Sequence, residues 1–471
     1  MKLSRKLLII SLFPLILSAC NSENSNDSSS NNPNDYKGFN TTAPMLSSVT
    51  DFNPYDRNSK GEIVPLGEFV YPFNTSITMT VFYPKKDKKP TDIVDQFEYD
   101  IQKYHTLFDR HYYYKKKGSN TIINNVRVIN ESYGSNKPIK VEKELFDILA
   151  KSKKMMSLSN GKFNITIGNL SSVWDEYIDG ACDIWGRQDE YVDKSIKQEK
   201  IVFYDPPKKE IKKALETVLT VDELDKSLVL NEETSEVTFK AVPRLEEKNL
   251  VPSLTLGGIG KGEATELFVD TPLAKKYCVR VNSGTSSIKF SNQRIDGGKW
   301  GISFSNPLYY EKHLAVGLIK EIPLNDTEYK INKDGSFGLS TSGFYQQYFF
   351  DDTTALRRHH IINPETGYSN YYTDTENYEG TFDAITLLMD DAGLSDMYTT
   401  ALMNTTSLEE ANALLDKLNE GFNTNGEALY FKRCKEDKNI KEELYVPESL
   451  ESSIEVKKDL KYPLSTKLIT Y

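Results

Sequence analysis

Cysteine and histidine are scarce in this chain, whose 471 residues include four cysteines and five histidines. The cysteines lie far apart, so the sequence has neither a disulfide framework nor the paired spacing of a zinc site. Of the last three (Cys182, Cys278 and Cys434), we expect at least one to stay buried and free, although an oxidising compartment would permit one pair. Among the histidines only His359 and His360 are close in sequence, and adjacent residues rarely bind one metal ion.

An excess of positive charge is also absent, because 58 basic and 68 acidic residues give a net charge of −10. This balance argues against a nucleic-acid partner. The apolar run Leu7–Leu17 is too short to span a bilayer. It follows a basic segment and ends in Leu-Ser-Ala-Cys20, which is typical of a signal peptide over residues 1–19 and resembles a lipobox. We expect lipidation of Cys20 and a location at the extracytoplasmic face of the cell membrane; an ordinary signal peptide with an incidental cysteine is the alternative.

Composition divides the rest of the chain into three parts. Residues from Asn21 to about Asn40 are nearly all Asn, Ser, Asp and Pro, and we expect residues 20–45 to form a disordered tether after the lipidated cysteine. Residues 46–430 are expected to form one domain, with an insertion around 183–210 that reads as a solvated loop. Residues 431–471 form a charged C-terminal extension.

Apolar periodicity predicts a mixture of helices and strands without βαβ alternation, which indicates the α+β class. The predicted helices cover residues 92–107, 141–156, 262–274 and 408–418, and the predicted strands cover 76–83, 277–282 and 300–305. Two further pieces read as strands, VLTVDEL at 218–224 and SLVLNEETSEVTFK at 227–240. The second has a turn at Asn231 and predicts a hairpin.

The segment Thr386–Met403, TLLMDDAGLSDMYTTALM, predicts a short strand that leads into a helix. Asp396 and Thr400 are four residues apart and therefore share one face of that helix. A carboxylate and a hydroxyl on a rigid element are the hard oxygen ligands that Mg²⁺ prefers. Taken alone, the pair is more typical of a surface or capping pair, and we expect Asp390 and Asp391 to form a solvated acidic face.

Residues 256–262, Leu-Gly-Gly-Ile-Gly-Lys-Gly, place four glycines just before a predicted helix. Such a turn lets backbone N–H groups approach an anion. No Ser or Thr follows Lys261, so this is not a Walker loop, and Glu263 breaks the dinucleotide fingerprint. By pattern alone, a phosphate site and a tight structural turn both remain open.

Further segments follow a fixed order with these two: SNGKFN at 159–164, GNLSSVW ending at 174, GKWGISFSNP at 298–307, STSG at 340–343 and HIINPETG at 360–367. The ordered series resembles the ApbE family of FAD:protein FMN transferases over roughly residues 70–420. The resemblance implies an α+β fold with mixed or antiparallel sheets and flanking helices, the ApbE-like (T-fold-like) architecture.

The resemblance also implies roles for individual residues. Mg²⁺ would be held by Asp396, Thr400 and the backbone carbonyl of Gly260, where the family usually has Ala. His360 would act as general base on an acceptor hydroxyl. The residues implied to contact FAD are Gly257, Gly258, Lys261, Asn164, Asn282, Ser340, Thr341 and Ser342.

Besides Gly260, four places depart from the family pattern. Thr255, Asn363 and Asn164 each stand where the family has Asp, and Asn282-Ser-Gly-Thr-Ser-Ser replaces Asn-x-Gly-Gly. The main hypothesis is a lipid-anchored enzyme that transfers FMN from FAD to a Thr or Ser of a membrane-associated client flavoprotein and releases AMP. The alternatives are a Mg²⁺-dependent FAD pyrophosphatase and a flavin-binding lipoprotein without catalysis.

Overall fold

The computed structural model describes residues 35–178, 204–284, 286–304, 307, 329–344, 348–351, 353–354, 356–371, 380–436, 439–456 and 466–471. The signal peptide, Cys20, Cys182 and residues 183–203 of the expected insertion therefore lie outside the described residues. Within the described part of the chain, no helix is long and apolar enough to cross a membrane.

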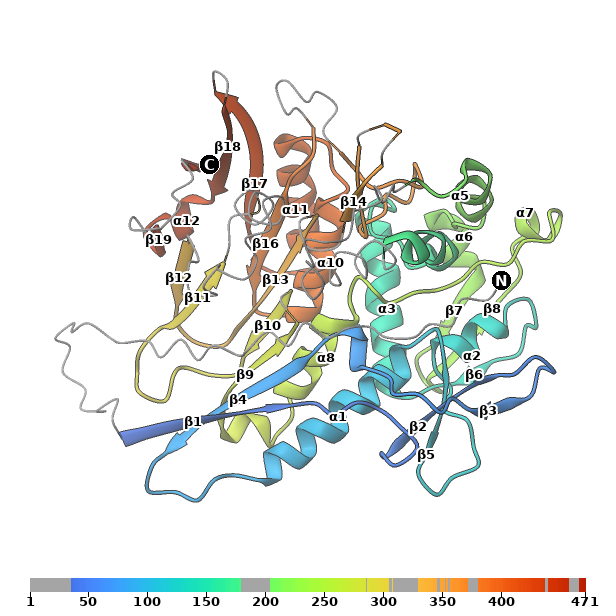
Figure 1. Cartoon of the computed structure of the whole chain (residues 1–471), viewed down its shortest axis with the longest axis horizontal. Coiled ribbons are helices and arrows are strands. Elements are labelled where there is room, and N and C mark those ends of the chain that lie inside the picture. Colours follow the sequence, from blue (N-terminus) through green and yellow to red (C-terminus); the bar gives the residue numbers. More distant parts are fainter. Residues whose placement is uncertain are drawn as a thin grey trace, which may run out of the picture.

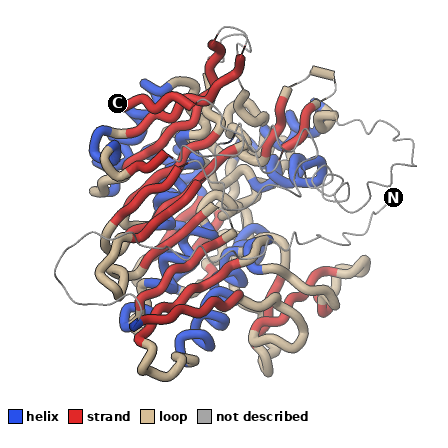
Figure 2. Tube along the Cα trace, turned by 60° about the vertical axis from the view of Figure 1, so that its left-hand side comes forward, coloured by secondary structure: helices blue, strands red, loops and turns tan. Residues whose placement is uncertain are grey.

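A nine-stranded sheet forms the central layer of the fold (Figure 1). Its order is β1 (Tyr36–Thr42), β4 (Ile77–Pro84), β9 (Cys278–Ser283), β10 (Ser287–Phe290), β13 (Phe337–Gly343), β16 (Ala384–Met389), β17 (Glu427–Glu436), β18 (Asn439–Val446) and β20 (Thr466–Thr470). Neighbouring strands are antiparallel except for the β18–β20 pair. Figure 2 shows these strands as one continuous, twisted layer.

Helices cover one face of this sheet, and the main hydrophobic core lies between the two layers. The longer helices are α1 (Asp92–Phe108), α3 (Lys143–Leu158), α8 (Gly260–Val269), α10 (Ala392–Leu402) and α11 (Leu408–Phe422). In α1, Ile93, Phe97 and Ile101 are fully buried at helical spacing, so the amphipathic pattern sets which face packs inward. Helix α10 packs on both α8 and the strands β13 and β16, which places its residues at the centre of the molecule.

Smaller elements surround this two-layer core. The strands of the small sheets are β11 (Trp300–Phe304), β12 (Tyr329–Lys333) and β19 (Ile454–Val456); β14 (Tyr348–Phe350) and β15 (Arg357–His359); β2 (Phe52–Arg57), β3 (Ile63–Pro65) and β5 (Tyr113–Lys116); and β6 (Ile139–Lys140), β7 (Leu228–Asn231) and β8 (Glu236–Phe239). The short helices are α2 (Val126–Glu131), α5 (Lys208–Leu215), α6 (Val221–Ser227), α7 (Pro243–Glu246) and α12 (Glu448–Glu451), with 3₁₀ turns η2 (Pro72–Asn74) and η3 (Ala274–Lys276).

The α+β class and most of the predicted elements are confirmed, including the hairpin β7–β8 with its turn after Asn231. The prediction of a strand over 218–224 is wrong, because residues from Val221 onward form helix α6. Thr220 accepts a hydrogen bond from the Glu223 N–H while the Glu223 carboxylate accepts one from the Thr220 N–H. This capping box starts a helix despite the β-branched residues.

The expected tether and C-terminal extension both join the sheet. Tyr36–Thr42 is strand β1 rather than disordered chain, because it pairs along its whole length with β4 and Phe39 packs on the main core. The boundary expected at residue 430 falls inside β17, and β18 and β20 continue the sheet beyond it. In contrast, the expectation of a buried free cysteine is confirmed by Cys278.

Candidate active site

The carboxylate of Asp396 lies at the centre of a dense hydrogen-bond network beneath the glycine-rich turn. The residue is 5% exposed. Its Oδ2 accepts a hydrogen bond from the Gly262 N–H at 2.8 Å, and its Oδ1 accepts one from the Ser287 hydroxyl at 2.7 Å and another from the Ser340 hydroxyl. Burial raises the pKa of this carboxyl, although Lys261 and the hydrogen-bond donors oppose the shift. Because burial disfavours the charged form of the carboxyl, a nearby cation would stabilise that form.

Thr400 lies one turn further along α10 and faces the same glycine-rich turn. Its hydroxyl donates to the Asp396 carbonyl at 3.0 Å. A Cβ atom at Gly258 would lie 3.3 Å from the Thr400 hydroxyl oxygen, so the hydroxyl faces the side of Gly258 where a side chain would be. The predicted sharing of one helix face by Asp396 and Thr400 is thus matched by their contacts with residues 258–262, at the start of α8.

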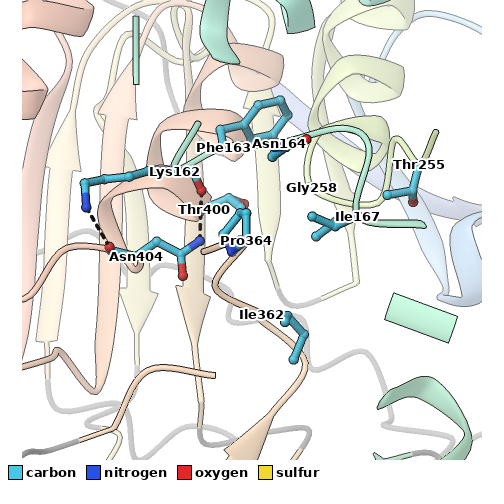
Figure 3. A pocket seen from close by; sticks show the side chains of 10 residues that line it. All are labelled: Lys162, Phe163, Asn164, Ile167, Thr255, Gly258, Ile362, Pro364, Thr400 and Asn404. Carbon is cyan, nitrogen blue, oxygen red and sulfur yellow. Dashed lines mark hydrogen bonds between the residues drawn. The ribbon is translucent and has the colours of Figure 1, made fainter. Parts of the chain in front are cut away.

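A pocket opens beside Thr400 and gathers residues from four of the sequence segments (Figure 3). Its lining consists of Lys162, Phe163, Asn164, Ile167, Thr255, Gly258, Ile362, Pro364, Thr400 and Asn404. The pocket measures about 40 Å³, which holds only a few water molecules. A dinucleotide would therefore have to extend along its mouth rather than sit inside it.

Lys162 and Asn404 tie the SNGKFN segment to the end of α10. The Lys162 ammonium donates to the Asn404 carbonyl at 3.2 Å, and the Asn404 amide donates to the Lys162 carbonyl at 3.0 Å (Figure 3). Sequence reasoning missed Asn404, which lies just after the end of α10, and the only signal for it was its position four residues after Thr400.

The segment HIINPETG contributes Ile362 and Pro364 to the pocket and carries two histidines in different environments. His359 is buried; its Nδ1 accepts the Ile361 N–H, and its Nε2 bonds the Asn370 carbonyl at 3.0 Å. Burial, together with the neighbouring His360, lowers the pKa of His359 to about 3. His360, by contrast, is exposed two residues from the pocket wall. Of the pair, only His360 is open to solvent, and its predicted role as general base stays a prediction.

Three departures from the family pattern have local structural roles here. The Asn363 side-chain oxygen accepts the Glu365 and Thr366 N–H groups, an Asx turn that Asn and Asp form equally well. Thr255 accepts the Gly257 N–H through its hydroxyl at 3.3 Å. Asn164 holds Thr166 through its side-chain oxygen and donates its amide to the Leu219 carbonyl, so its predicted contact with a nucleotide stays a prediction.

The hydroxyls of residues 340–342, on β13, bond partners on α10 and β16. Ser340 bonds Asp396, Thr341 bonds Thr386 at 2.8 Å, and Ser342 donates to Thr399 at 2.9 Å. Ser340 therefore holds the carboxylate, and the predicted phosphate or ribityl contacts of this segment stay predictions. Asn282, on β9, has a buried side-chain oxygen without a hydrogen-bond partner, so a donor could still be accepted there.

A buried ionic cluster that sequence reasoning missed fixes the N-terminus of α10. Lys151 contacts Glu263 at 2.6 Å and Asp391 at 3.3 Å, while Lys289 contacts Glu266 at 2.9 Å. Glu266 also accepts the Ala392 N–H, and Asp391 caps the helix through the Leu394 N–H. Asp391 is thus a helix cap in an ion pair rather than part of a solvated acidic face. Burial raises the pKa of Glu266 to about 7.

A second buried network supports the glycine-rich turn from the opposite side. His105 accepts the Phe73 N–H at Nδ1 (3.1 Å) and bonds the Tyr114 hydroxyl at Nε2 (3.1 Å), and Tyr114 donates to Asp109 at 2.7 Å. Burial lowers the pKa of His105, which keeps the imidazole neutral. Phe73 has a left-handed backbone (φ 53°), and its ring lies against Gly260.

Within the described ranges, no group of three or more His, Cys, Asp or Glu side chains is arranged to hold a metal ion. The donors gathered here are of another kind: one carboxylate, one hydroxyl and the backbone of a glycine-rich turn. Such all-oxygen sets, completed by water and phosphate, suit Mg²⁺. The raised pKa of the buried Asp396 carboxyl fits a position where a cation would stabilise its charge.

Comparison with known proteins identifies the fold and the family. No curated protein matches the chain. Among solved structures, the flavin transferase ApbE from Vibrio cholerae has a TM-score of 0.54 at 15% identity and covers 89% of this chain and 99% of its own. The ApbE protein from Thermotoga maritima has a TM-score of 0.51 at 20% identity, covering 77% of this chain and 92% of its own.

The apo flavinyl transferase ApbE from Pseudomonas stutzeri is similar as well, with a TM-score of 0.51 at 15% identity over 86% of this chain and 94% of its own. These low identities establish the fold. The family model for the ApbE family matches residues 73–424, which agrees with the extent of the resemblance in the sequence. The chain belongs to the ApbE family.

Proposed function

We propose that this protein is a Mg²⁺-dependent FAD:protein FMN transferase that releases AMP. The observation that carries the proposal is the arrangement around α10. Asp396 and Thr400 share the helix face that meets the glycine-rich turn, and the segment with His360 walls the adjoining pocket. Family membership supports the reaction class, since solved relatives of the same fold are named flavin transferases.

Asp396, Thr400 and the Gly260 carbonyl would hold Mg²⁺. When bound, the ion would neutralise charge on the FAD pyrophosphate and orient the phosphorus for displacement. Lys261 would add a positive charge close to the same carboxylate, since it already acts electrostatically on Asp396. The Gly262 N–H at the start of α8 already donates to Asp396, and this end of a helix favours negative charge.

His360 would remove the proton from a Thr or Ser hydroxyl of the client protein. The acceptor oxygen then forms a bond to the phosphorus of the FMN half, while the bond from that phosphorus to the AMP oxygen breaks. AMP leaves with the electron pair and gains a proton. The product is FMN joined to the client by a phosphoester bond.

The N-terminal segment supports an extracytoplasmic location. With Cys20 lipidated after removal of residues 1–19, lipid chains would anchor the protein in the membrane. The clients would then be membrane-associated flavoproteins whose acceptor hydroxyl faces the same side. An anchored enzyme and an anchored substrate meet in two dimensions, which raises their effective concentration.

The test is to incubate the protein with FAD, Mg²⁺ and a peptide that carries a candidate acceptor Thr, and to identify products by mass spectrometry. A phosphoester-linked FMN on the peptide, with one AMP released per modification, supports transfer. Free FMN and AMP beside an unmodified peptide support hydrolysis by water. Stoichiometric binding of intact FAD supports a carrier without catalysis.

Metal dependence needs a separate measurement. Chelation should abolish turnover of FAD, and titration with Mg²⁺ should restore it in the wild type but not in Asp396→Asn. Turnover that persists in chelator, or in Asp396→Ala, would contradict the metal assignment. Binding of Mn²⁺, followed by electron paramagnetic resonance with and without Asp396→Asn, reads out the site without any activity.

A further inference from the structure

The point where the chain enters the fold lies beside a cluster of lysines. Strand β1 forms one edge of the nine-stranded sheet, and Tyr36 at its start pairs with Pro84 at the end of β4. The Lys85 N–H donates to the Asp35 carbonyl at 2.8 Å, so the segment 84–90, PKKDKKP, is fastened to the entry point. Both lie at the lower left of Figure 1.

We define the basic edge as Lys37, Lys85, Lys86, Lys88 and Lys89, all of which are exposed. Only Asp35 and Asp87 lie among them in sequence, so five positive and two negative charges leave +3 at this edge of a chain whose net charge is −10. None of the five lysines belongs to an ion pair with a described residue. Their charge is therefore directed to solvent or to a partner.

Aromatic rings lie next to these lysines. The Lys89 ammonium is 4.2 Å from the ring centroid of Phe39, and the Lys37 ammonium is 4.9 Å from that of Tyr83. The two rings contact each other edge to face at 5.8 Å. Lysines with aromatic rings beside them are typical of surfaces that meet the headgroup region of a bilayer.

We propose that the basic edge binds the surface of a bilayer that contains anionic phospholipid. The lysines are spread along a strand and a turn rather than around a cavity, which suits an extended plane of negative charge better than a small anion. The predicted lipid attachment at Cys20 precedes Asp35 by 15 residues, which reach roughly 50 Å when extended. Charge attraction acts within about 8 Å, so anchoring alone would leave the orientation free and the basic edge would set it.

This inference is independent of flavin transfer, and it uses the proposed anchor only to choose a lipid surface over an acidic protein. Sheet edges are also places where strands of other chains can pair. A lysine on an edge strand discourages such pairing, so Lys37, which would face lipid, also disfavours the pairing of β1 with a second sheet.

The experiment measures sedimentation of the full chain with vesicles of phosphatidylcholine, alone or mixed with phosphatidylglycerol. All proteins carry Cys20→Ser, which removes the lipid attachment site, and share the apolar run 7–17. The test variant replaces Lys85, Lys86, Lys88 and Lys89 by Glu. The matched control makes the same charge change on α5, at the upper right of Figure 1, by replacing Lys208, Lys209, Lys212 and Lys213 by Glu.

We expect the parent protein to prefer the anionic vesicles, with binding weakened by salt. The test variant should lose at least about tenfold in partitioning, since each basic residue near such a surface contributes measurably, and the α5 control should keep most of it. Equal losses in both variants, or no loss in either, would overturn the proposal. Circular dichroism confirms that both variants are folded.

Transfer of FMN to a soluble peptide should be the same in both variants, so a failed lipid experiment leaves the proposed activity untouched. If the test variant still binds vesicles like the parent but no longer modifies a whole client protein, the basic edge recognises protein rather than lipid. That result would also overturn the inference.

Discussion

Two regions near the pocket are built in opposite ways: the rigid side, which is Asp396 with its hydrogen-bond donors, and the histidine side, which is His360 on its turn. Asp396 is 5% exposed and accepts three hydrogen bonds from three separate elements, α8, β10 and β13. His360 is exposed on a turn that follows a strand of three residues, β15. The first group is held by three donors inside the fold, whereas the second faces solvent.

This difference follows from what each side must meet. The pyrophosphate of a nucleotide is a small group of fixed shape, and a rigid carboxylate on a packed helix can be matched to it. A protein acceptor arrives from outside with its own surface, and a general base at the rim can reach its hydroxyl. The buried ionic cluster at the start of α10 supports the rigid side alone.

The largest effect should come from removing the charge on the rigid side. Asp396→Asn keeps the size of the side chain, but its amide group cannot accept the hydrogen bonds that the second oxygen accepts. FMN transfer should fall by at least about 10³-fold. The assay is release of AMP from FAD, and Asp390→Asn is the control because it removes an exposed carboxylate six residues away. Equal activity of both variants would show that the charge of Asp396 is not used.

Substitutions of the two adjacent histidines should affect different properties, His360 the transfer reaction and His359 the stability of the fold. His360→Ala should lower FMN transfer by about 10²-fold or more and leave the melting temperature unchanged. His359→Ala should instead lower the free energy of unfolding by about 1–3 kcal/mol, because the Ile361 N–H and the Asn370 carbonyl lose a buried partner. Thermal unfolding and AMP release are measured on both. A stability loss in His360→Ala with normal chemistry would reverse the assignment.

Acidity should act on the rigid side through Glu266, whose pKa is about 7 in the folded protein and about 4.5 when unfolded. The folded state therefore holds the proton more tightly. Its stabilising contribution is complete below pH 4.5 and is lost as the pH rises through 7. Glu266→Gln should remove on the order of 2 kcal/mol of this dependence, measured by denaturant unfolding at pH 5.5 and pH 8. An unchanged pH dependence in the variant would exclude Glu266 as its source.

The smallest effect should come from the support behind the glycine-rich turn. His105→Leu removes the acceptor for the Phe73 N–H and should lower the free energy of unfolding by about 1–2 kcal/mol. His105→Gln offers an amide oxygen at a similar place and should recover part of the loss. If both variants unfold alike, the hydrogen bond to Phe73 contributes nothing measurable.

Much of the rigid side was visible in the sequence, because helical spacing alone places Asp396 and Thr400 on one face. Ser287 and Ser340 were not recognised as partners of Asp396, since strand pairing brings them there from residues more than 50 positions away. Lys289 was missed for a similar reason: a lysine in a strand normally reads as exposed, and only the tertiary fold supplies Glu266.

The histidine side was predicted only through the resemblance. A turn rich in Asn, Pro and Gly is evident from residue types, but nothing in HHIINPETG says which histidine is buried. Likewise, the capping box that starts the helix at residues 221–227 was visible in the sequence. The strand prediction was wrong because it gave more weight to the β-branched residues. Local hydrogen-bond motifs deserve more weight than average propensity in such short segments.

The last two glycines of the turn, Gly260 and Gly262, differ in how well they should tolerate substitution. A Cβ at Gly262 would lie 2.2 Å from the Ala392 carbonyl oxygen. Because this oxygen belongs to the backbone of α10, it cannot move aside as a flexible side chain could. A Cβ at Gly260 would meet only the edge of the Phe73 ring, at 3.1 Å, and a ring can shift by a few tenths of an ångström. In a saturation library, position 260 should therefore accept alanine while position 262 accepts glycine alone. The close approach of α8 to α10 thus depends on residue 262 having a hydrogen atom in place of a side chain.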